Sequence, residues 1–387
     1  MHQKTVLHFI KTKSILSDGR LLKWIDSLEG VNIKSKIVVL EDANEKIKTT
    51  LGSSTEVQKI KLQSRRFFKK KGSGFLLKIP EYAFKCYRNF ISSKEEIVVF
   101  HDNQHYLTLL LLLIFNQFNK RKIIWDLHEL PHSSLLRLSI TRKFLKAVLE
   151  NCYMVIHTNT QRYEFLHSQL QFSEKKSVIL NNYPEIEYIL SEKKENSSAI
   201  NDWLNGEQYI LWLGAATKTR CFDTVFEAYK HYSKSFKLII LGNITEEFKQ
   251  LILKNNLSNR IWNSYVDQSE IINFIDNAMF SIVLYKNNSP NNYYCEPNRV
   301  YQLLARKIPA IVGNNPRLLE MVKDRNFGIV LENDGSDSKS MLDAFDNMIQ
   351  KHTYFKQTLN NTKFETIFSW EKQFDSIVIK LENAFDN

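Results

Sequence analysis

The chain has 387 residues, of which 43% are hydrophobic, 25% charged and 12% aromatic. These values exclude extensive disorder, and the length is too great for one modest core, so we expect two domains. A formal net charge of +11 calls for an anionic partner or a concentrated basic surface.

The cysteines and the apolar runs bear on the cellular compartment. Four cysteines lie far apart, with no C-x-x-C pair, at positions 86, 152, 221 and 295. This fits a reducing compartment and predicts neither disulfides nor a zinc site. Residues 1–10 are too mixed for a signal peptide. The longest apolar run, Tyr106–Phe115, is about half the length of a spanning helix. We therefore expect a cytoplasmic protein in which this run is a buried helix beside a sheet.

Short β-branched runs alternate with amphipathic stretches in the first half, which is typical of parallel strands joined by crossover helices. The predicted strands are residues 5–10, 36–40, 97–100, 122–125, 155–158 and 178–180, and the predicted helices include 133–150 and 160–170. From Glu187 to Asn205 the apolar period is lost, and the composition predicts a linker.

The alternation then restarts and continues to the end of the chain. The predicted strands are residues 209–213, 237–241, 261–266, 281–285, 310–312 and 328–331, with helices at 221–232 and 245–255 and a helical tail at 364–385. We expect a first domain over 1–185, a linker over 186–206, a second domain over 207–365 and a terminal helix over 366–387. Two doubly wound α/β domains would place a ligand cleft at the carboxyl ends of both sheets.

The most informative segment is Cys295–Val312, where a polar loop meets a proline, a short helix and a β-branched strand. Pro297 at the helix start loses no hydrogen bond and leaves free N–H groups exposed. Together with the helix dipole and Arg299, these groups predict an anion site, most plausibly for a phosphate or pyrophosphate. The alternative is an ordinary helix start with a basic neighbour.

This segment resembles the Pro-Asn-Lys, acidic-helix, Pro-Val-Ile stretch of GT-B glycosyltransferases of the family 4 type. Asp126-Leu127-His128-Glu129 is similar to an Asp-x-His-Glu element of one family 4 subgroup. Further matches in order are Glu150 before a strand, Asn181-Asn182-Tyr183-Pro184 after one, and Gly214 with Arg220 six residues later. The resemblance runs from Glu96 to about Trp370.

The resemblance implies a GT-B fold, in which two Rossmann-like doubly wound α/β domains face each other across a cleft and the tail helix crosses back to the first. It also implies a nucleotide-sugar donor on the second domain and an acceptor on the first. No Asp-x-Asp pair suited to a metal–diphosphate is present, and such enzymes generally need no bound metal, so we expect no metal and no cofactor.

On the donor side, Arg220 is the candidate for neutralising the leaving diphosphate, with Lys218 as a substitute. Gln302 stands where the family usually has a glutamate that bonds the ribose of the nucleotide. The glutamine amide can still form hydrogen bonds but is not a charged acceptor, so the identity of the donor nucleotide stays open. The expected donor-binding residues are Gly214, Arg220, Gly242, Pro297, Asn298, Arg299 and Gln302. The two glycines end strands, where backbone either approaches a ligand or simply turns.

On the acceptor side, polar residues follow two predicted strands. His101 and Asp102 follow the strand at 97–100, and Asp126, His128 and Glu129 end the strand at 122–125. If transfer inverts the configuration of the anomeric centre, an imidazole or carboxylate there could take a proton from the acceptor hydroxyl. If transfer retains that configuration, the same group could bind the acceptor. A solvated loop, or a cap of the helix from Ser133, is the structural alternative.

Basic residues concentrate in residues 61–88, where nine of them interleave with aromatic and aliphatic residues. The pattern favours an anionic membrane surface. Single-stranded nucleic acid or a solvated basic face would also fit the charge, but the other motifs give nucleic acid no support.

Taken with the resemblance, these patterns predict a glycosyltransferase of bacterial surface polysaccharide synthesis, peripheral at the inner face of the cell membrane. It would transfer sugar from a nucleotide diphosphate to a glycan or lipid-linked acceptor. A non-hydrolysing sugar-nucleotide epimerase and a catalytically silent GT-B subunit supporting a partner transferase are the alternatives. No Walker loop or Gly-x-Gly-x-x-Gly is present, which counts against a kinase or a dehydrogenase.

Overall fold

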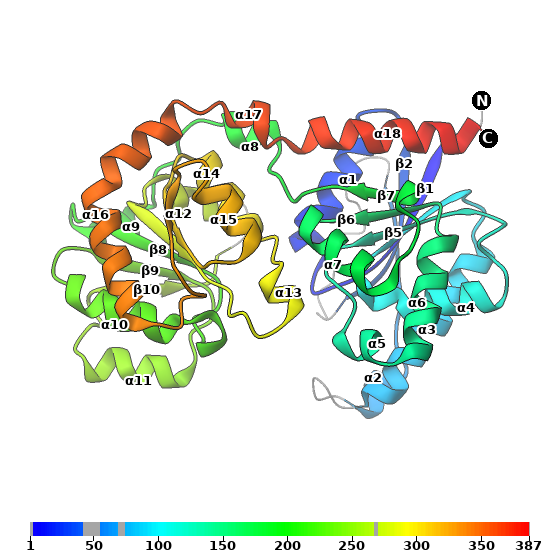
Figure 1. Cartoon of the computed structure of the whole chain (residues 1–387), viewed down its shortest axis with the longest axis horizontal. Coiled ribbons are helices and arrows are strands. Elements are labelled where there is room, and N and C mark those ends of the chain that lie inside the picture. Colours follow the sequence, from blue (N-terminus) through cyan, green and yellow to red (C-terminus); the bar gives the residue numbers. More distant parts are fainter. Residues whose placement is uncertain (1–2, 42–54, 69–73, 267–269, 387) are drawn as a thin grey trace. The chain divides into compact units, whose positions relative to one another are not determined.

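The computed structural model describes residues 3–41, 55–68, 74–266 and 270–386. The chain divides into two compact units, one of residues 1–181 with 371–387 and the other of residues 182–370 (Figure 1). Each unit is a parallel sheet with helices on both faces, so the doubly wound α/β class is confirmed.

Within the described residues the first unit has a seven-stranded sheet in the order β3-β2-β1-β4-β5-β6-β7. Its strands are β1 (Thr5–Thr12), β2 (Lys34–Glu41), β3 (Glu56–Lys59), β4 (Ile97–His101), β5 (Lys122–Leu127), β6 (Met154–His157) and β7 (Ser177–Ile179). Its helices are α1 (Gly19–Glu29), α2 (Ser64–Phe67), α3 (Phe75–Ser92), α4 (Tyr106–Ile114), α5 (Ser133–Arg137), α6 (Ser139–Asn151), α7 (Thr160–Leu170) and α18 (Trp370–Asp386).

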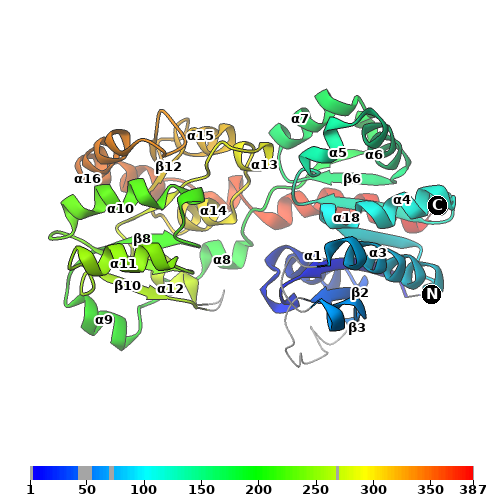
Figure 2. The same cartoon turned by 90° about the horizontal axis from the view of Figure 1, so that it is seen from below.

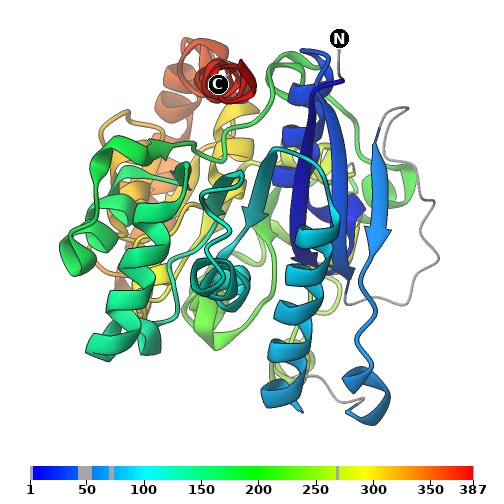
Figure 3. The same cartoon turned by 90° about the vertical axis from the view of Figure 1, so that its right-hand side faces the viewer.

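Helices cover both faces of this sheet. On one face α1 packs on β1 and β2 through Ile10, Ile25 and Val39, and α18 joins α1 where Phe374 meets the Trp24 ring edge-on at 4.8 Å. On the other face α4 lies between α3 and α6 (Figure 3).

The second unit has a six-stranded sheet in the order β10-β9-β8-β11-β12-β13, counted over the described part of the chain. Its strands are β8 (Tyr209–Leu213), β9 (Lys237–Leu241), β10 (Ile261–Ser264), β11 (Phe280–Val283), β12 (Ala310–Val312) and β13 (Gly328–Val330). Its helices are α8 (Ile186–Leu190), α9 (Ser198–Leu204), α10 (Phe222–Tyr232), α11 (Glu246–Lys254), α12 (Ile271–Asp276), α13 (Pro290–Tyr293), α14 (Asn298–Ala305), α15 (Pro316–Val322), α16 (Ser338–Asn360) and α17 (Phe364–Ile367).

Alternation along the strands builds two separate cores in this unit. Successive residues of β8 point to opposite faces, so Leu211 joins the core under α14 and α15, whereas Trp212 joins the core under α10 and α16 (Figures 1 and 2). Both faces of the central strands β8, β9, β11 and β12 are buried, which explains their continuous apolar runs in the sequence.

Strand order reverses between β1 and β4 in the first sheet and between β8 and β11 in the second. Ligands of open α/β sheets bind beyond the carboxyl ends of the strands at such a reversal. The loops that follow these four strands are therefore where a site is expected.

The structure differs from the sequence-based expectation in four segments. The helix expected at 133–150 is broken at Leu138, which is extended and precedes α6. The expected linker 186–206 contains α8 and α9. Their residues Ile189 and Ile200 are buried in the core of the second unit that lies under α14 and α15. Strand β3 was not predicted. The run Tyr106–Phe115 is helical as expected, but Ile114 and Phe115 are more than half exposed, so it is not a buried helix.

Among the described residues, no helix has both the length and the apolar character needed to cross a membrane.

Candidate functional site

In the second unit, two glycines clear the space at the ends of β8 and β9. Gly214 and Gly242 both have positive φ, at +107° and +150°. A Cβ on Gly214 would lie 2.6 Å from the Arg299 guanidinium, and one on Gly242 would lie 2.4 Å from the carbonyl oxygen of Gly214. A side chain on Gly242 would therefore require a shift of the backbone, whereas one on Gly214 would displace the side chain of Arg299.

Arg299, in the first turn of α14, extends back over the end of β8. Its guanidinium donates to the carbonyl of Leu213. Burial lowers its pKa below the usual value; Tyr285 opposes this shift and the positive charge of Arg220 adds to it. Two guanidinium groups are thus held close to each other after β8.

Arg220 lies over the ring of Tyr285, with 4.0 Å between its guanidinium carbon and the ring centroid. Tyr285 follows β11, so these residues meet at the reversal between β8 and β11. The Nη1 atom of Arg220 is buried without a hydrogen-bond partner, and within the described residues no carboxylate pairs with Arg220 or Arg299. Two neighbouring, partly buried cations that have no counter-charge within the described residues define an anion site.

The other predicted donor-side residues lie around this pair. Pro297 is the buried residue that precedes α14. Asn298 is exposed and Gln302 is half-buried. Neither side chain makes a hydrogen bond to another described residue.

The start of α14 is held by a buried polar cluster that the sequence did not reveal. Glu296 accepts a hydrogen bond from the hydroxyl of Tyr301 and lies 3.3 Å from Nε of Arg317. Arg317 also donates to the hydroxyl of Tyr183 at 3.1 Å. Each of these groups is satisfied, so the cluster fixes the helix start that carries Arg299.

In the first unit, Asp126 at the end of β5 is the centre of a hydrogen-bond network. Arg20 of α1 donates to both carboxylate oxygens, at 2.7 and 3.0 Å. The Trp24 indole donates at 3.1 Å, and His101 and His128 each lie 3.2 Å away. Burial alone would raise the pKa of Asp126, but the charge of Arg20, followed by that of His128, holds it well below the usual range.

Asp126 also sets the protonation of two buried histidines. An ionised carboxylate accepts from Nδ1–H of His101, which leaves Nε2 of His101 as an acceptor. Nδ1–H of His8 then donates to Nε2 of His101, 2.9 Å away. Nε2 of His8 is left as a buried acceptor without a hydrogen-bond partner among the described residues. Burial lowers the pKa of both rings below the usual value, so both are neutral and fully enclosed.

His128 is the member of this network that reaches the surface, with 20% of its side chain exposed. Nε2–H donates to Asp126, and Nδ1 has no hydrogen-bond partner in the part of the chain that the structure describes. Burial lowers the pKa of His128, but the charge and hydrogen bond of Asp126 outweigh it and the net pKa is raised. The ring is therefore oriented and made more basic, with Nδ1 available.

Asp102 and Glu129 extend the acceptor-side group. Partial burial of the Glu129 carboxyl, and then the charge of Asp102, raise its pKa. Asp102 has φ 71° and ψ 168°, a conformation that non-glycine residues rarely adopt and that marks functional sites more often than others. The structure thus brings the five predicted residues together, with His101 and Asp126 buried inside and His128, Asp102 and Glu129 toward solvent.

His101, Asp126 and His128 also have ligand atoms within 4.8 Å of one another, as in a metal site. The donor set does not fit an ion, because the bidentate guanidinium of Arg20 already neutralises the carboxylate. A divalent cation there would have to displace a buried cation.

Three members of the network were not singled out from the sequence, namely His8, Arg20 and Trp24. Arg20 did leave a signal, since it shares the buried side of α1 with Leu21, Trp24 and Leu28. A charged residue at a core position of an amphipathic helix indicates a buried counter-charge. His8 lies within an apolar strand and left no such signal.

The two parallel sheets with their flanking helices have the architecture of the GT-B fold. No known family model matches the chain, and no curated protein matches it. Solved structures do. The chain is similar to a sucrose-phosphate synthase from Thermosynechococcus elongatus, with 14% identity, a TM-score of 0.74 and 99% of each chain covered.

Two further neighbours have the same fold. One is HepE of Anabaena in complex with UDP, with 12% identity and a TM-score of 0.68 over 98% of this chain and all of that one. The other is WaaG, a glycosyltransferase involved in lipopolysaccharide biosynthesis, with 10% identity and a TM-score of 0.70 over 96% of this chain and 99% of that one. At these identities the likeness establishes the fold.

Proposed function

We propose that this chain is a glycosyltransferase that moves a sugar from a nucleotide diphosphate donor to a glycan or lipid-linked acceptor in bacterial surface polysaccharide synthesis. The observation that carries the proposal is the pair Arg220 and Arg299, two cations without a counter-charge at the strand-order reversal of a GT-B fold. The UDP complex of HepE, a neighbour in fold, supports it.

In this proposal the second unit holds the donor. Arg220 and Arg299 would neutralise the diphosphate as the glycosidic bond breaks, which stabilises the leaving group where its charge develops. Gly214 leaves room for the Arg299 guanidinium, and Gly242 for the backbone of Gly214, so the two glycines allow the close packing that places Arg299 at the donor site. Asn298 would add a side-chain amide at the exposed first turn of α14. No metal is required, because the two guanidinium groups supply the positive charge.

The first unit holds the acceptor. His128 is the residue we assign to the acceptor hydroxyl, since Nδ1 is available and Asp126 fixes the ring through Nε2. Asp102 and Glu129 would bind further hydroxyls. Arg20, Trp24 and His101 are positioning residues that keep Asp126 ionised and in place.

The acceptor of such an enzyme is often carried by a lipid, and the basic segment 61–88 would bring the enzyme to an anionic membrane. In its described part, Arg66 and Arg88 are exposed and so are Phe67 and Phe84. Lys69, Lys70 and Lys71 belong to the same prediction but lie outside the described residues.

Calorimetric titration with UDP and GDP tests the donor site. Arg220→Ala should weaken binding of whichever nucleotide binds the parent by about 1.5–3 kcal/mol, the range for a hydrogen bond to a charged group. Lys254→Ala, an exposed cation on α11 of the same unit, is the control and should bind as the parent does.

Two outcomes would redirect the proposal. Unchanged affinity in Arg220→Ala would remove this arginine from the site. Lys218 is exposed and paired with Glu247 at 2.5 Å, so a loss in Lys218→Ala instead would move the diphosphate toward it. Nucleotide binding without transfer to any acceptor would favour a silent GT-B subunit.

A further inference from the structure

Helix α4 carries apolar side chains on the side that faces away from the sheet. Thr108, Leu109 and Leu112 are buried toward the sheet. Opposite them, at the helical spacing i, i+3, i+4 and i+7, Leu107, Leu110 and Leu111 are half-buried and Ile114 is 62% exposed. A surface helix normally has polar residues on this stripe, yet no charged residue occurs from Tyr106 to Phe118.

The two helices beside α4 continue the apolar surface. On α3, Leu76, Leu77 and Phe84 are exposed, and at the start of α6 so are Leu138, Ile140 and Phe144. We call the outward surfaces of α3, α4 and α6 the α4 face. Exposed apolar residues that gather on adjacent helices, rather than scatter singly, indicate an interaction surface.

Charges of one sign surround this surface. Residues 64–67, 75–92, 106–114, 133–137 and 139–151, which form α2 to α6, contain nine basic residues and two acidic ones. Both acidic residues are paired within their own helices, Glu81 with Lys85 at 3.1 Å and Glu150 with Lys146 at 3.6 Å. The net charge of these five helices is therefore positive.

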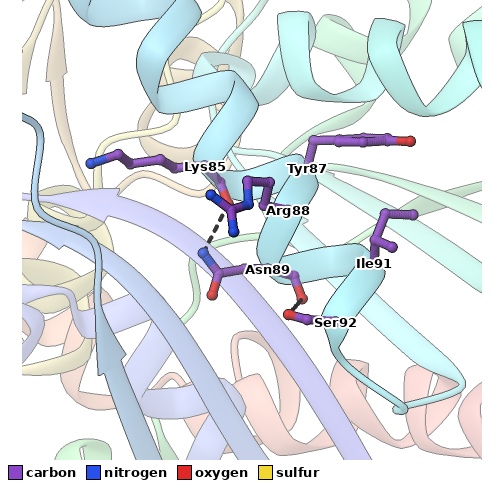
Figure 4. A pocket seen from close by; sticks show the side chains of 6 residues that line it. All are labelled: Lys85, Tyr87, Arg88, Asn89, Ile91 and Ser92. Carbon is purple, nitrogen blue, oxygen red and sulfur yellow. Dashed lines mark hydrogen bonds between the residues drawn. The ribbon is translucent and has the colours of Figure 1, made fainter.

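Cations and apolar groups also mix along α3 itself. Figure 4 shows Tyr87 and Ile91 extending from one side of this helix and Lys85 from the other, with Arg88 between them. The ring of Tyr87 lies 5.3 Å from that of Phe115, just after α4, so this apolar side adjoins α4. Lys85, Tyr87, Arg88 and Ile91, all on α3, are among the residues that line a surface hollow of about 460 Å³.

We infer that the α4 face inserts its apolar side chains into the surface of an anionic bilayer while the flanking lysines and arginines bind lipid headgroups. An apolar stripe bordered by cations is the pattern of a helix that lies in a membrane interface. A second copy of the chain fits less well, because an isologous contact would bring two positive borders together.

This inference extends the membrane contact of the proposed function, and only the biological purpose of that contact rests on the proposed function. The contact surface now includes α4 and α6 in addition to the segment 61–88. Its binding energy comes from insertion of apolar side chains as well as from electrostatic attraction. The two contributions respond differently to salt, because added ions screen the headgroup attraction and leave apolar insertion in place.

Flotation of the full chain with vesicles tests the inference. Phosphatidylcholine vesicles are compared with vesicles that also contain phosphatidylglycerol, at about 0.1 M and about 1 M salt. We expect the parent to float with the anionic vesicles and to keep part of its binding at high salt. The triple variant Ile114→Ser, Leu138→Ser, Ile140→Ser should lose that salt-resistant part by about tenfold or more.

Two further variants sharpen the result. Arg142→Ser with Lys143→Ser should lower binding at low salt and leave the salt-resistant part. Leu253→Ser with Ile379→Ser removes two residues that are 58% and 59% exposed on α11 and α18, and should bind as the parent does. Thermal melting of each variant separates loss of binding from loss of fold.

Two results would overturn the inference. One is a parent that floats with neither vesicle, or a triple variant that floats as the parent does. The other is a parent dimer in light scattering that the triple variant converts to a monomer without any flotation, which would assign the face to a second copy. UDP affinity does not enter these readouts, so failure here leaves the donor site untouched.

Discussion

At the scale of single residues, one buried carboxylate decides what its neighbours can do. Asp126 is neutralised by Arg20 and oriented by Trp24 and His101. It is enclosed and stays ionised, so its role is to hold His128 rather than to take a proton itself. In the proposed function, proton transfer on the first unit is therefore assigned to the imidazole of His128, which reaches solvent.

From this arrangement we predict that His128→Gln lowers the rate of sugar transfer on the order of 100-fold or more, the range for an acid–base group. Nucleotide affinity should not change, because the substitution lies in the other unit. The measurement is turnover with a donor and acceptor pair, beside calorimetry of UDP.

His132→Gln is the matched control, since His132 is exposed in the same loop and its side chain, within the described residues, bonds Ser134 alone. Parental turnover in both variants would show that the acceptor hydroxyl is not held by His128.

At the scale of elements, the ends of β8 and β9 and the start of α14 fit together through two glycines. Leu213 accepts a hydrogen bond from Arg299 across this junction. The buried cluster of Glu296, Tyr301 and Arg317 fixes the helix from its other side. The position of Arg299 thus depends on three elements and not on its own loop.

The two glycines should respond differently to alanine. In Gly214→Ala the new methyl group meets the end of a flexible arginine, so we expect weaker UDP binding with a small loss of stability. In Gly242→Ala it meets the backbone of Gly214, which cannot move aside, so we expect a loss of unfolding free energy of about 1–3 kcal/mol. Calorimetry and urea unfolding separate the two effects.

Gly206→Ala is the control for backbone strain, because Gly206 also has a positive φ but no atom lies within 4 Å of its Cβ position. Equal UDP affinity in Gly214→Ala and Gly206→Ala would contradict the placement of Arg299.

At the scale of the whole molecule, the two units differ in their sensitivity to acid. The first unit buries His8, His101, His105 and His157, and burial lowers the pKa of each, to about 3 for His105 and His157. In the unfolded chain these rings bind protons below about pH 6.5. The unfolded state then holds more protons than the native state, so stability falls as the pH falls from about 6.5 toward 3.

We expect His105 and His157 each to remove about 1.4 kcal/mol of stability per pH unit in that window. His128, whose pKa is raised, acts outside that window, because its stabilising contribution is fully present below about pH 6.5 and is lost as the pH rises through the raised pKa. Hydrogen exchange measured at several pH values should show the first unit opening before the second. His157→Gln should reduce the dependence on pH, whereas His231→Gln, an exposed position in the second unit, should leave it unchanged.

A first unit that keeps its protection at pH 4.5 as well as at pH 7 would mean that these rings are not buried and neutral in the native state.

The sequence by itself determined the α/β class and most of the strands, because strands buried on both faces give continuous apolar runs that are visible residue by residue. It also placed Arg220, Arg299 and His128 at strand and helix ends, since those positions follow from the local pattern. Only the tertiary structure paired Arg20 with Asp126 across 106 residues of chain and turned the stripe of α4 outward. It also left Arg220 and Arg299 with no counter-charge in the part of the chain that the structure describes. These three features depend on which elements distant in sequence pack together, and the local periodicity of the sequence does not determine that packing.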